Sequence, residues 1–508
     1  MTRLLVTTTF AAFLTTTPVL ADLTVDDAWN TWKAQFTALG LRFEASETRD
    51  GEALQIGELR LNADFPLGFG TVYVHVPGPR FEPMDGGRVA VTMAPTGLMS
   101  MGGDITGEGS FAMAFEVQDN NSRGVMSGTT TAVISDWTSD GFSAALVDLA
   151  VSGEQAVDIS GNLTMGPLTA HHETTLADGM LGLTAVTEMS GYDLQYTASL
   201  PDRDLGQMEV AATGMAGKTT SRSQFSLPET GIDILGLHKQ LRNDLDLSIR
   251  TITDVTSSTQ SVKVDGELVS DQKTSATDYD VFVKLGRFGL DYGGRVGGFN
   301  ADLIMPELPF PISFGGGAAD FRLLIPLLMG EDQDAALHMG FNDITLNDGL
   351  WAMFDPEQQL PRDPMTVVLD AASKASILFE FLDLRALLDG AQPPALPVMA
   401  KTATLNDLRL AGAGAEVTGK GDFTFDYSDL TTFDGMPAPE GRASFTINGA
   451  HGLIDKLIAM GLMEQSDAMG ARLMMGLLTQ PGDGDDVLTT TIEVKKTGEV
   501  LANGQRLQ

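Results

Sequence analysis

The residue types best suited to bind a metal gather at His171, His172 and Glu173. Imidazole and carboxylate groups bind zinc when two or three of them converge on one point. The surrounding alternation predicts a strand, and adjacent side chains on a strand point to opposite faces. His171 and Glu173 could therefore converge, whereas His172 could not. The other histidines lie far away in the sequence, so we predict a solvated strand face and no metal site.

A second cluster, Asp483, Asp485 and Asp486, follows Pro481 and Gly482. Alternating carboxylates in a glycine-rich loop can bind calcium, but the full calcium-loop pattern also requires a closing glutamate, which is missing here. We predict an acidic turn before the final strands and no cation site.

Nucleophilic and phosphate chemistry lack a recognisable set of residues. The chain has no G-x-S-x-G elbow, and His238, His338 and His451 have no acid–nucleophile context. The glycine pairs at 293–294 and 297–298 lie between strand patterns, not in the strand-to-helix turn of a phosphate loop. The chain contains no cysteine, which excludes thiol catalysis, iron–sulfur clusters and thiolate zinc sites. We therefore predict no catalytic, cofactor-binding or metal-binding residues, and a protein that is not an enzyme.

Composition places the chain among globular proteins, with 43% hydrophobic and 20% charged residues. Its formal net charge of −36 repels nucleic acid and anionic lipid headgroups, so we expect no nucleic-acid partner. Without cysteine, stability must come from burial and backbone pairing.

Residues 1–21 have the pattern of a signal peptide. A basic start at Arg3 precedes an uncharged apolar stretch, and Val19 and Ala21 supply the small side chains that a signal peptidase requires. We expect cleavage after Ala21 and a periplasmic mature chain beginning at Asp22. No later stretch reaches the roughly 18 apolar residues of a transmembrane helix, so we expect no transmembrane segment after cleavage.

Alternation of period two dominates the rest of the chain, for example in 71–76, 88–93, 110–117 and 488–495. Residues 262–269 predict two short strands about an Asp-Gly turn, or one strand with a bulge. The expected fold is mainly β, a β-rich α+β class with large curved antiparallel sheets and a few short amphipathic helices.

The clearest helix begins at Thr24, a predicted N-cap with Asp27 three residues later, and ends at Gly40. Its apolar residues Trp29, Trp32, Phe36 and Leu39 fall on one face. The spacing also predicts helices over 231–245, 322–329, 347–354 and 377–388, and a helical hairpin over 451–462 and 466–478 with Ser466 as the second N-cap.

Two β-rich halves follow from this organisation, residues 22–229 and 230–508, with a boundary near Leu227–Gly231. Each half opens with one of the first two predicted helices. Proline-rich breaks at 306–311 and 393–397 interrupt the second half.

Several motifs of the second half resemble a known family: Leu350–Pro356, Leu360–Pro364, Leu405–Leu410, Gly419–Phe425, Asn448–Gly449 and Asn503–Gly504. They resemble bacterial envelope proteins catalogued as domain of unknown function 2125. The resemblance covers about residues 300–508 by motif and 22–300 by layout. That family is similar in character to the β-rich envelope proteins that include the AsmA-like lipid-handling group, and it has no assigned functional residues.

Within these motifs, Trp351 and Phe354 share one face of a predicted helix and should anchor it to the sheet. Asp355–Pro356 ends the helix. Arg362 lies in a stiff turn, where it could pair with Asp355 or Asp363.

Three classes of function are compatible with the sequence. The leading one is an exported, non-enzymatic envelope protein whose curved sheet holds a lipid or an envelope partner. The alternative is a porin-like outer-membrane β-barrel, although 7% aromatic residues are few for two interfacial girdles. The third is an exported hydrolase with an unrecognised site.

Overall fold

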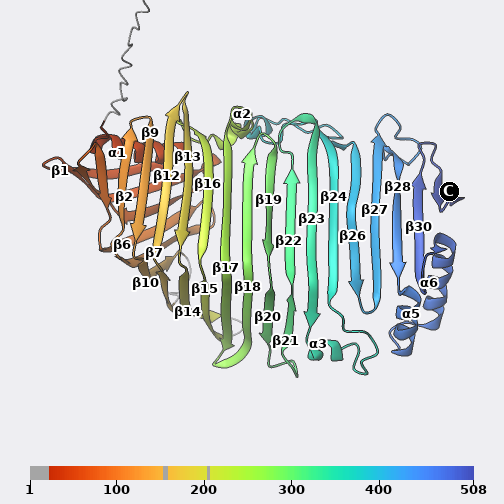
Figure 1. The fold of residues 1–508 in the computed structure, drawn as a ribbon. Helices are drawn as coiled ribbons and strands as arrows, with labels where there is room; N and C mark the ends of the chain where they lie inside the picture. The colour runs from red at the N-terminus through yellow and green to blue at the C-terminus, as the bar shows by residue number, and fades with distance from the viewer. Residues whose placement is uncertain (1–21, 153–157, 203–205, 508) are drawn as a thin grey trace, which may run out of the picture.

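The computed structural model describes residues 22–152, 158–202 and 206–507, and the predicted signal peptide lies outside them. Strands make up 62% of the chain and helices 12%. Every strand belongs to one antiparallel sheet that runs from β1 to the carboxy-terminal strands and curls strongly (Figure 1). The predicted fold class is confirmed.

The chain forms a long meander in which neighbours in sequence pair in space. The first half contributes β1 (Arg42–Asp50), β2 (Ala53–Phe65), β3 (Gly70–Pro77), β4 (Arg80–Met84), β5 (Arg88–Thr92), β6 (Thr96–Ile105), β7 (Gly109–Asp119), β8 (Arg123–Thr129), β9 (Ala132–Ser139), β10 (Phe142–Val151), β11 (Asp158–Met165), β12 (Leu168–Ala177), β13 (Met180–Met189), β14 (Tyr192–Asp202), β15 (Gly206–Ala216) and β16 (Thr219–Pro228). The second half contributes β17 (Asp246–Val264), β18 (Glu267–Gly286), β19 (Gly289–Val296), β20 (Phe299–Ile304), β21 (Ile312–Gly316), β22 (Ala318–Ile325), β23 (Gly330–Leu346), β24 (Met365–Ile377), β25 (Val398–Ala400), β26 (Thr402–Gly412), β27 (Ala415–Asp426), β28 (Ala438–Asn448), β29 (Gln480–Pro481), β30 (Val487–Val494), β31 (Val500–Ala502) and β32 (Gln505–Arg506).

Helices lie at the ends and on one face of this sheet. They are α1 (Val25–Ala38), α2 (Leu237–Arg242), α3 (Asp348–Ala352), α4 (Leu384–Leu388), α5 (Ala450–Ala459) and α6 (Gln465–Leu478), with short 3-10 turns η1 (Pro66–Gly68) and η2 (Ile234–Gly236).

At many places a short kink divides one crossing of the sheet into two successive strands. β3 and β4 both pair with β2, and β15 and β16 both pair with β17, so the pairings from β2 to β17 close into a barrel-type ring of 16 strands. The kinks are tied to one another across the sheet: the Asn120 amide donates to the Gly141 carbonyl at 2.9 Å, and the Thr277 amide to the Gly298 carbonyl at 2.9 Å. One bent sheet results.

Left-handed residues at the kinks keep one face of the sheet apolar. In β23 the apolar side chains are the odd-numbered Leu337, Met339 and Phe341 before the kink, and Leu346 after it. Asp343 lies between them with a φ of 55°. An inserted bulge residue shifts the alternation by one position. Odd-numbered side chains therefore point to the apolar face before the kink, and even-numbered side chains point to the same face after it.

The sheet wraps around α1. Gln35 donates to the Thr174 hydroxyl of β12 at 2.8 Å, while Asp26 pairs with Arg49 of β1. The strands β1 and β12 are six steps apart through β2, β4, β5, β8 and β9, about 29 Å in a flat sheet. Nine residues of helix rise only about 14 Å. The sheet must therefore curve toward the helix, which places α1 on its concave side.

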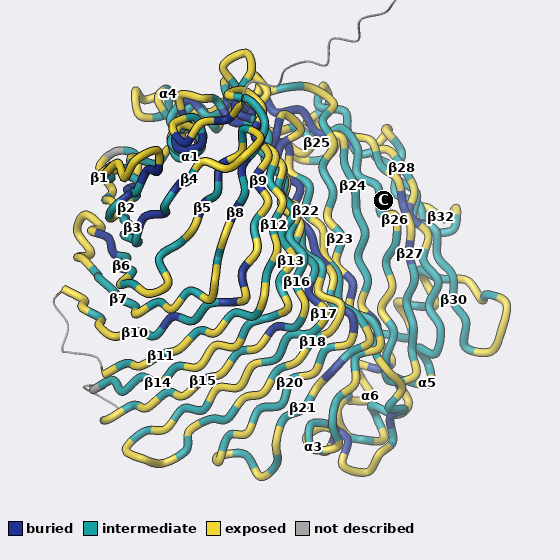
Figure 2. The backbone as a smooth tube through the Cα atoms, turned by 60° about the vertical axis from the view of Figure 1, so that its left-hand side comes forward, coloured by how far each residue is buried: buried dark blue, intermediate teal, exposed yellow. Residues whose placement is uncertain are grey.

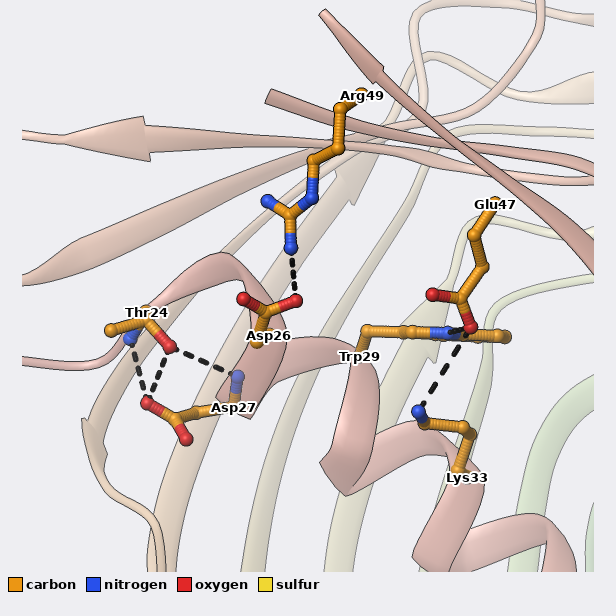
Figure 3. A network of polar contacts seen from close by, with 7 residues as sticks. All are labelled: Thr24, Asp26, Asp27, Trp29, Lys33, Glu47 and Arg49. Carbon is orange, nitrogen blue, oxygen red and sulfur yellow. Dashed lines mark hydrogen bonds and ion pairs between the residues drawn. The ribbon is translucent and has the colours of Figure 1, made fainter. Parts of the chain in front are cut away.

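The start of α1 follows the sequence prediction. The Thr24 hydroxyl accepts from the Asp27 amide at 3.1 Å, and the Asp27 carboxylate accepts from the Thr24 amide at 3.1 Å, a complete capping box (Figure 3). Trp29 is buried against strands of the amino-terminal part, in a core that includes Leu54, Ile56, Leu59, Phe81, Val89, Val91 and Met126.

A second core lies under the end of α1 and under α2. It consists of Ala38, Leu181, Leu227, Leu241, Leu245 and Leu328, with Leu382 packed against it. Figure 2 shows the buried segments near α1 and along the adjacent strands, while much of the rest of the sheet is intermediate or exposed.

Three helix predictions need correction. Residues 322–329 are not helical, since Ala318–Ile325 forms β22 between β19 and β23. Pairing on both sides outweighs the local spacing there. The helix predicted over 231–245 covers only Leu237–Arg242, and that over 377–388 covers only Leu384–Leu388. Glu464, not Ser466, occupies the N-cap of α6.

Other local predictions are confirmed. The helix predicted over 347–354 is present as α3, and the Asn347 side chain caps it by accepting from the Leu350 amide at 3.1 Å. Asp265 and Gly266, with φ values of 49° and 84°, make the turn between β17 and β18, although these strands are long rather than short.

The strands on either side of the 229/230 boundary pair directly, β16 with β17.

In the turn after α3, Arg362 does not pair with either of the predicted partners, Asp355 and Asp363. Trp351 is buried, as expected of an anchor, but Phe354 is 39% exposed. Arg362 pairs with Asp348 and lies 5.7 Å from the Trp351 ring. Asp355 is unavailable to it because its carboxylate accepts from the amides of Gln359 and Leu360, at 2.8 and 2.9 Å.

Candidate functional site

One face of the sheet is apolar from β17 to β26. Residues paired across neighbouring strands share a face. One such row crosses seven strands in the order Ile249, Val283, Tyr292, Leu323, Leu337, Ala371 and Leu405. The same face carries Leu247 and Phe225, which pack in the second core beside α2. The apolar face is therefore the concave side that the helices partly cover.

The opposite face is polar, and ion pairs cross it from strand to strand. Arg250 binds Asp280 through Nε at 2.8 Å and Nη2 at 2.5 Å, and Arg322 binds Asp291 at 2.9 and 3.1 Å. His338 lies between Asp320 and Asp370, at 2.7 and 3.2 Å. This face is suited to water.

Large apolar side chains on the concave face stay accessible where no helix covers them. Nine of them, each 37–43% exposed, define what we call the apolar trough: Ile249, Tyr292, Phe321, Ile325, Leu337, Met339, Phe341, Val367 and Leu410. They lie on β17, β19, β22, β23, β24 and β26, and the half-buried Val283 of β18 lies between Ile249 and Tyr292. A contiguous exposed apolar surface of this kind marks a site for an apolar ligand or partner.

A pocket of about 730 Å³ deepens the trough at the α2 end of β22–β27. Leu323, Ile325, Leu337 and Ala371 line it together with Phe381 of the loop after β24. Among the described residues, no charged side chain lines the pocket. Its volume is in the range of pockets that enclose small ligands.

The two polar side chains of the pocket are already bonded within the sheet. The Ser373 hydroxyl donates to the Thr402 carbonyl at 2.6 Å, and the Thr402 hydroxyl accepts from the Lys374 amide at 2.8 Å. The pocket therefore offers a ligand dispersion contacts and exclusion of water, with few hydrogen bonds.

His171 and Glu173 share a face of β12, as the alternation indicates, and Asp136 of β9 joins them. The His171 Nδ1 lies 2.7 Å from Asp136, and Nε2 lies 3.3 Å from Glu173. The hydrogen bond with Asp136, and then that with Glu173, raise the pKa of His171. On the other face, burial lowers the pKa of His172. Within the described ranges, no group of three or more His, Cys, Asp or Glu could hold a metal ion.

The acidic turn at 483–486 caps a helix. The Asp486 carboxylate accepts from the amides of His451 and Gly452, at 3.1 and 2.9 Å, in the first turn of α5. A carboxylate at a helix N-terminus satisfies free amides and complements the helix dipole. Helix capping therefore accounts for one of the three aspartates there.

The sequence pattern predicts no binding residues, and it does not single out the residues of the apolar trough. The alternation at Leu337, Met339 and Phe341 was visible, but alternation predicts only that a face is apolar, not that it remains uncovered.

No helix in the described part of the chain is long and apolar enough to span a membrane. No family model matches the chain, and no curated protein matches it.

Proposed function

We propose that this chain is an exported, non-enzymatic envelope protein that holds the acyl chains of a lipid in the apolar trough. One observation carries the proposal: the trough is concave, continuous over neighbouring strands and lined in its pocket by uncharged, almost wholly apolar side chains. Burying such a surface against an acyl chain is favourable by about 25 cal/mol per Å². Export rests on the pattern of residues 1–21, and an envelope role rests on the resemblance to the domain of unknown function 2125.

The distribution of polarity favours this function over the porin-like alternative. A membrane barrel presents its apolar side to lipid on the outside and a polar side to its lumen. Here the concave side is apolar, while Arg250, Arg322 and His338 make ion pairs on the opposite face. The arrangement is that of a protein that shields an apolar ligand from water.

The pocket also lacks the arrangement that the hydrolase alternative needs. Of the described residues that line it, Ser373 alone supplies a serine hydroxyl, which donates to a main-chain carbonyl, and none is a histidine. A serine nucleophile requires a base within hydrogen-bond reach.

Lipid extraction tests the proposal directly. Protein purified from the periplasmic fraction without detergent is extracted with organic solvent, and the extract is analysed by mass spectrometry. We expect lipid in near-stoichiometric amount. Leu337→Asp places a carboxylate in the pocket, where its desolvation opposes binding of an acyl chain, and should reduce the lipid several-fold.

Thr418→Asp is the matched control, because it adds the same charge on the polar face, where Thr418 pairs with Arg409 across β26 and β27. We expect its lipid content to equal that of the wild type. An extract without lipid, or equal lipid in both variants, would contradict the proposal.

A further inference from the structure

The loop between β24 and β25, residues 378–397, which we call the strap, begins and ends at adjacent positions of the sheet. Ile377 pairs with Val398, and the Leu378 amide donates to the Pro397 carbonyl at 2.8 Å, so the strap leaves and rejoins the sheet at one point. Connections of this length are uncommon inside a compact fold, and lids and binding loops are among their known uses. The strap contains α4 and the predicted proline-rich break.

The strap closes one end of the apolar pocket. Phe381 and Leu382 line the pocket, and Leu382 also packs against the second core beneath α2. The strap therefore lies between two apolar regions that share the concave face. Beside it, Ala375 and Ile377 line the pocket and are each only 6% exposed.

Side chains rather than a strand ladder tie the strap to the segment that holds η2 and α2. Arg385 binds Asp233 at 2.7 Å, and Arg242 binds Glu380 at 2.5 Å. His238 contacts the Asp383 carboxylate at 3.6 Å. Among the described residues, no main-chain hydrogen bond joins these two segments. Since such partly exposed ion pairs contribute little each, the strap can separate from α2 without disturbing the sheet.

Two features of the closed strap favour its release. Glu380 Oε1 is buried without a hydrogen-bond partner, and an unsatisfied buried polar atom opposes the closed state. The return part of the strap, residues 389–396, is almost entirely exposed. The closed state is held by the two arginine ion pairs, by the His238 ring, whose Nε2 contacts Asp383 and whose Nδ1 lies 3.3 Å from the Leu382 carbonyl, and by the packing of Leu382.

We propose that residues 378–397 are a gate, which separates from α2 to let an acyl chain enter or leave the pocket at that end. The proposal rests on the proposed lipid-holding function for its ligand. Opening would join the pocket to the apolar side chains now beneath Leu382, which extends the trough toward α2.

Cysteine labelling tests the gate without any lipid. The chain contains no cysteine, so Ala375→Cys introduces a single thiol in the pocket beside the strap. Its rate of reaction with N-ethylmaleimide is compared in the wild-type background and with Arg242→Gln and Arg385→Gln, which remove two of the ties. We expect the rate to rise about fivefold or more, because reaction requires local opening.

Two controls separate release of the strap from general loosening. Ala443→Cys places a thiol of similar burial, 8% exposed, on β28 outside the pocket, and its labelling rate should not change. Arg409→Gln and Arg442→Gln break ion pairs with Glu416 and Glu493 far from the strap and should not accelerate labelling at position 375. If the labelling rate of Ala375→Cys is unchanged by Arg242→Gln and Arg385→Gln, the gate proposal is refuted.

Binding kinetics provide the second measurement, with a dansyl-labelled undecanoic acid as the probe. Asp233→Cys with Arg385→Cys, joined by a short bis-methanethiosulfonate cross-linker, fixes the strap to the η2 segment, because the side chains of these two residues now meet. We expect association and dissociation of the probe to slow about tenfold or more, and reduction of the cross-link to restore both rates.

The outcomes distinguish the gate from the function on which it rests. If no form binds the probe, yet release of the strap accelerates labelling, the gate stands and the lipid-holding function fails. If the probe binds but neither its rates nor the labelling respond to the strap, the gate is refuted and the lipid-holding function stands.

Discussion

Truncation of Trp29 should detach α1 from the sheet. The indole is 1% exposed, and its ring centroid lies 6.0–6.4 Å from those of Trp32, Phe36, Phe43 and Phe81. Its Nε1 donates to Glu47 Oε1 at 2.6 Å, in the polar network at the start of α1 (Figure 3). Trp29→Ala removes all of these contacts and leaves a cavity between the helix and the curved sheet.

The magnitude follows from burial. Replacing a fully buried tryptophan by alanine costs about 3–5 kcal/mol, from lost transfer free energy and the cavity. The hydrogen bond adds little, because the Glu47 side chain is 47% exposed and water can replace its partner. We expect a loss of about 4 kcal/mol, close to a thousandfold in the local opening equilibrium.

Hydrogen exchange of the α1 amides measures this loss, and a thermal melt reports its effect on the whole fold. The control is Phe69→Ala, whose side chain is 62% exposed and should cost less than about 0.5 kcal/mol. A change in α1 protection of less than about tenfold in Trp29→Ala would show that the sheet does not depend on this anchor.

Three further outcomes follow from charged groups. Burial lowers the pKa of His338, but the hydrogen bonds and charges of Asp320 and Asp370 outweigh this effect and raise it above 6.5. A histidine whose pKa is raised by folding stabilises the fold at pH values below its unfolded-state pKa, and this stability is lost as the pH rises through its folded-state pKa. His338→Gln should therefore lower the melting temperature more near pH 6 than near pH 9. A decrease that does not depend on pH would contradict the pairing. Asp486→Ala should reduce protection of the α5 amides by about 0.5–2 kcal/mol through loss of the cap, while a chelator leaves the wild-type melting temperature unchanged. Moderate sodium chloride should raise the melting temperature, because a net charge of −36 leaves acidic side chains that cannot all find basic partners; a flat or falling response would refute net repulsion.

Local chemistry determined much of this fold from sequence. The Thr24–Asp27 capping box and the Asp265–Gly266 turn each depend on a few neighbouring residues, and each lies where the sequence places it. The mainly β fold follows from alternation, which requires only that one face of each strand be apolar.

Tertiary contacts decided the rest. Residues 322–329 have helical spacing, yet residues 322–324 pair with both β19 and β23, and the Arg322 side chain binds Asp291 across the sheet. The partners of Arg362 and Asp355 depend on how a turn folds back on itself. The sequence could not predict the apolar trough, because a strand covered by a helix and a strand left uncovered can have the same alternation of apolar and polar residues. Only the positions of α1, α2 and the strap show which apolar side chains stay exposed and which are buried.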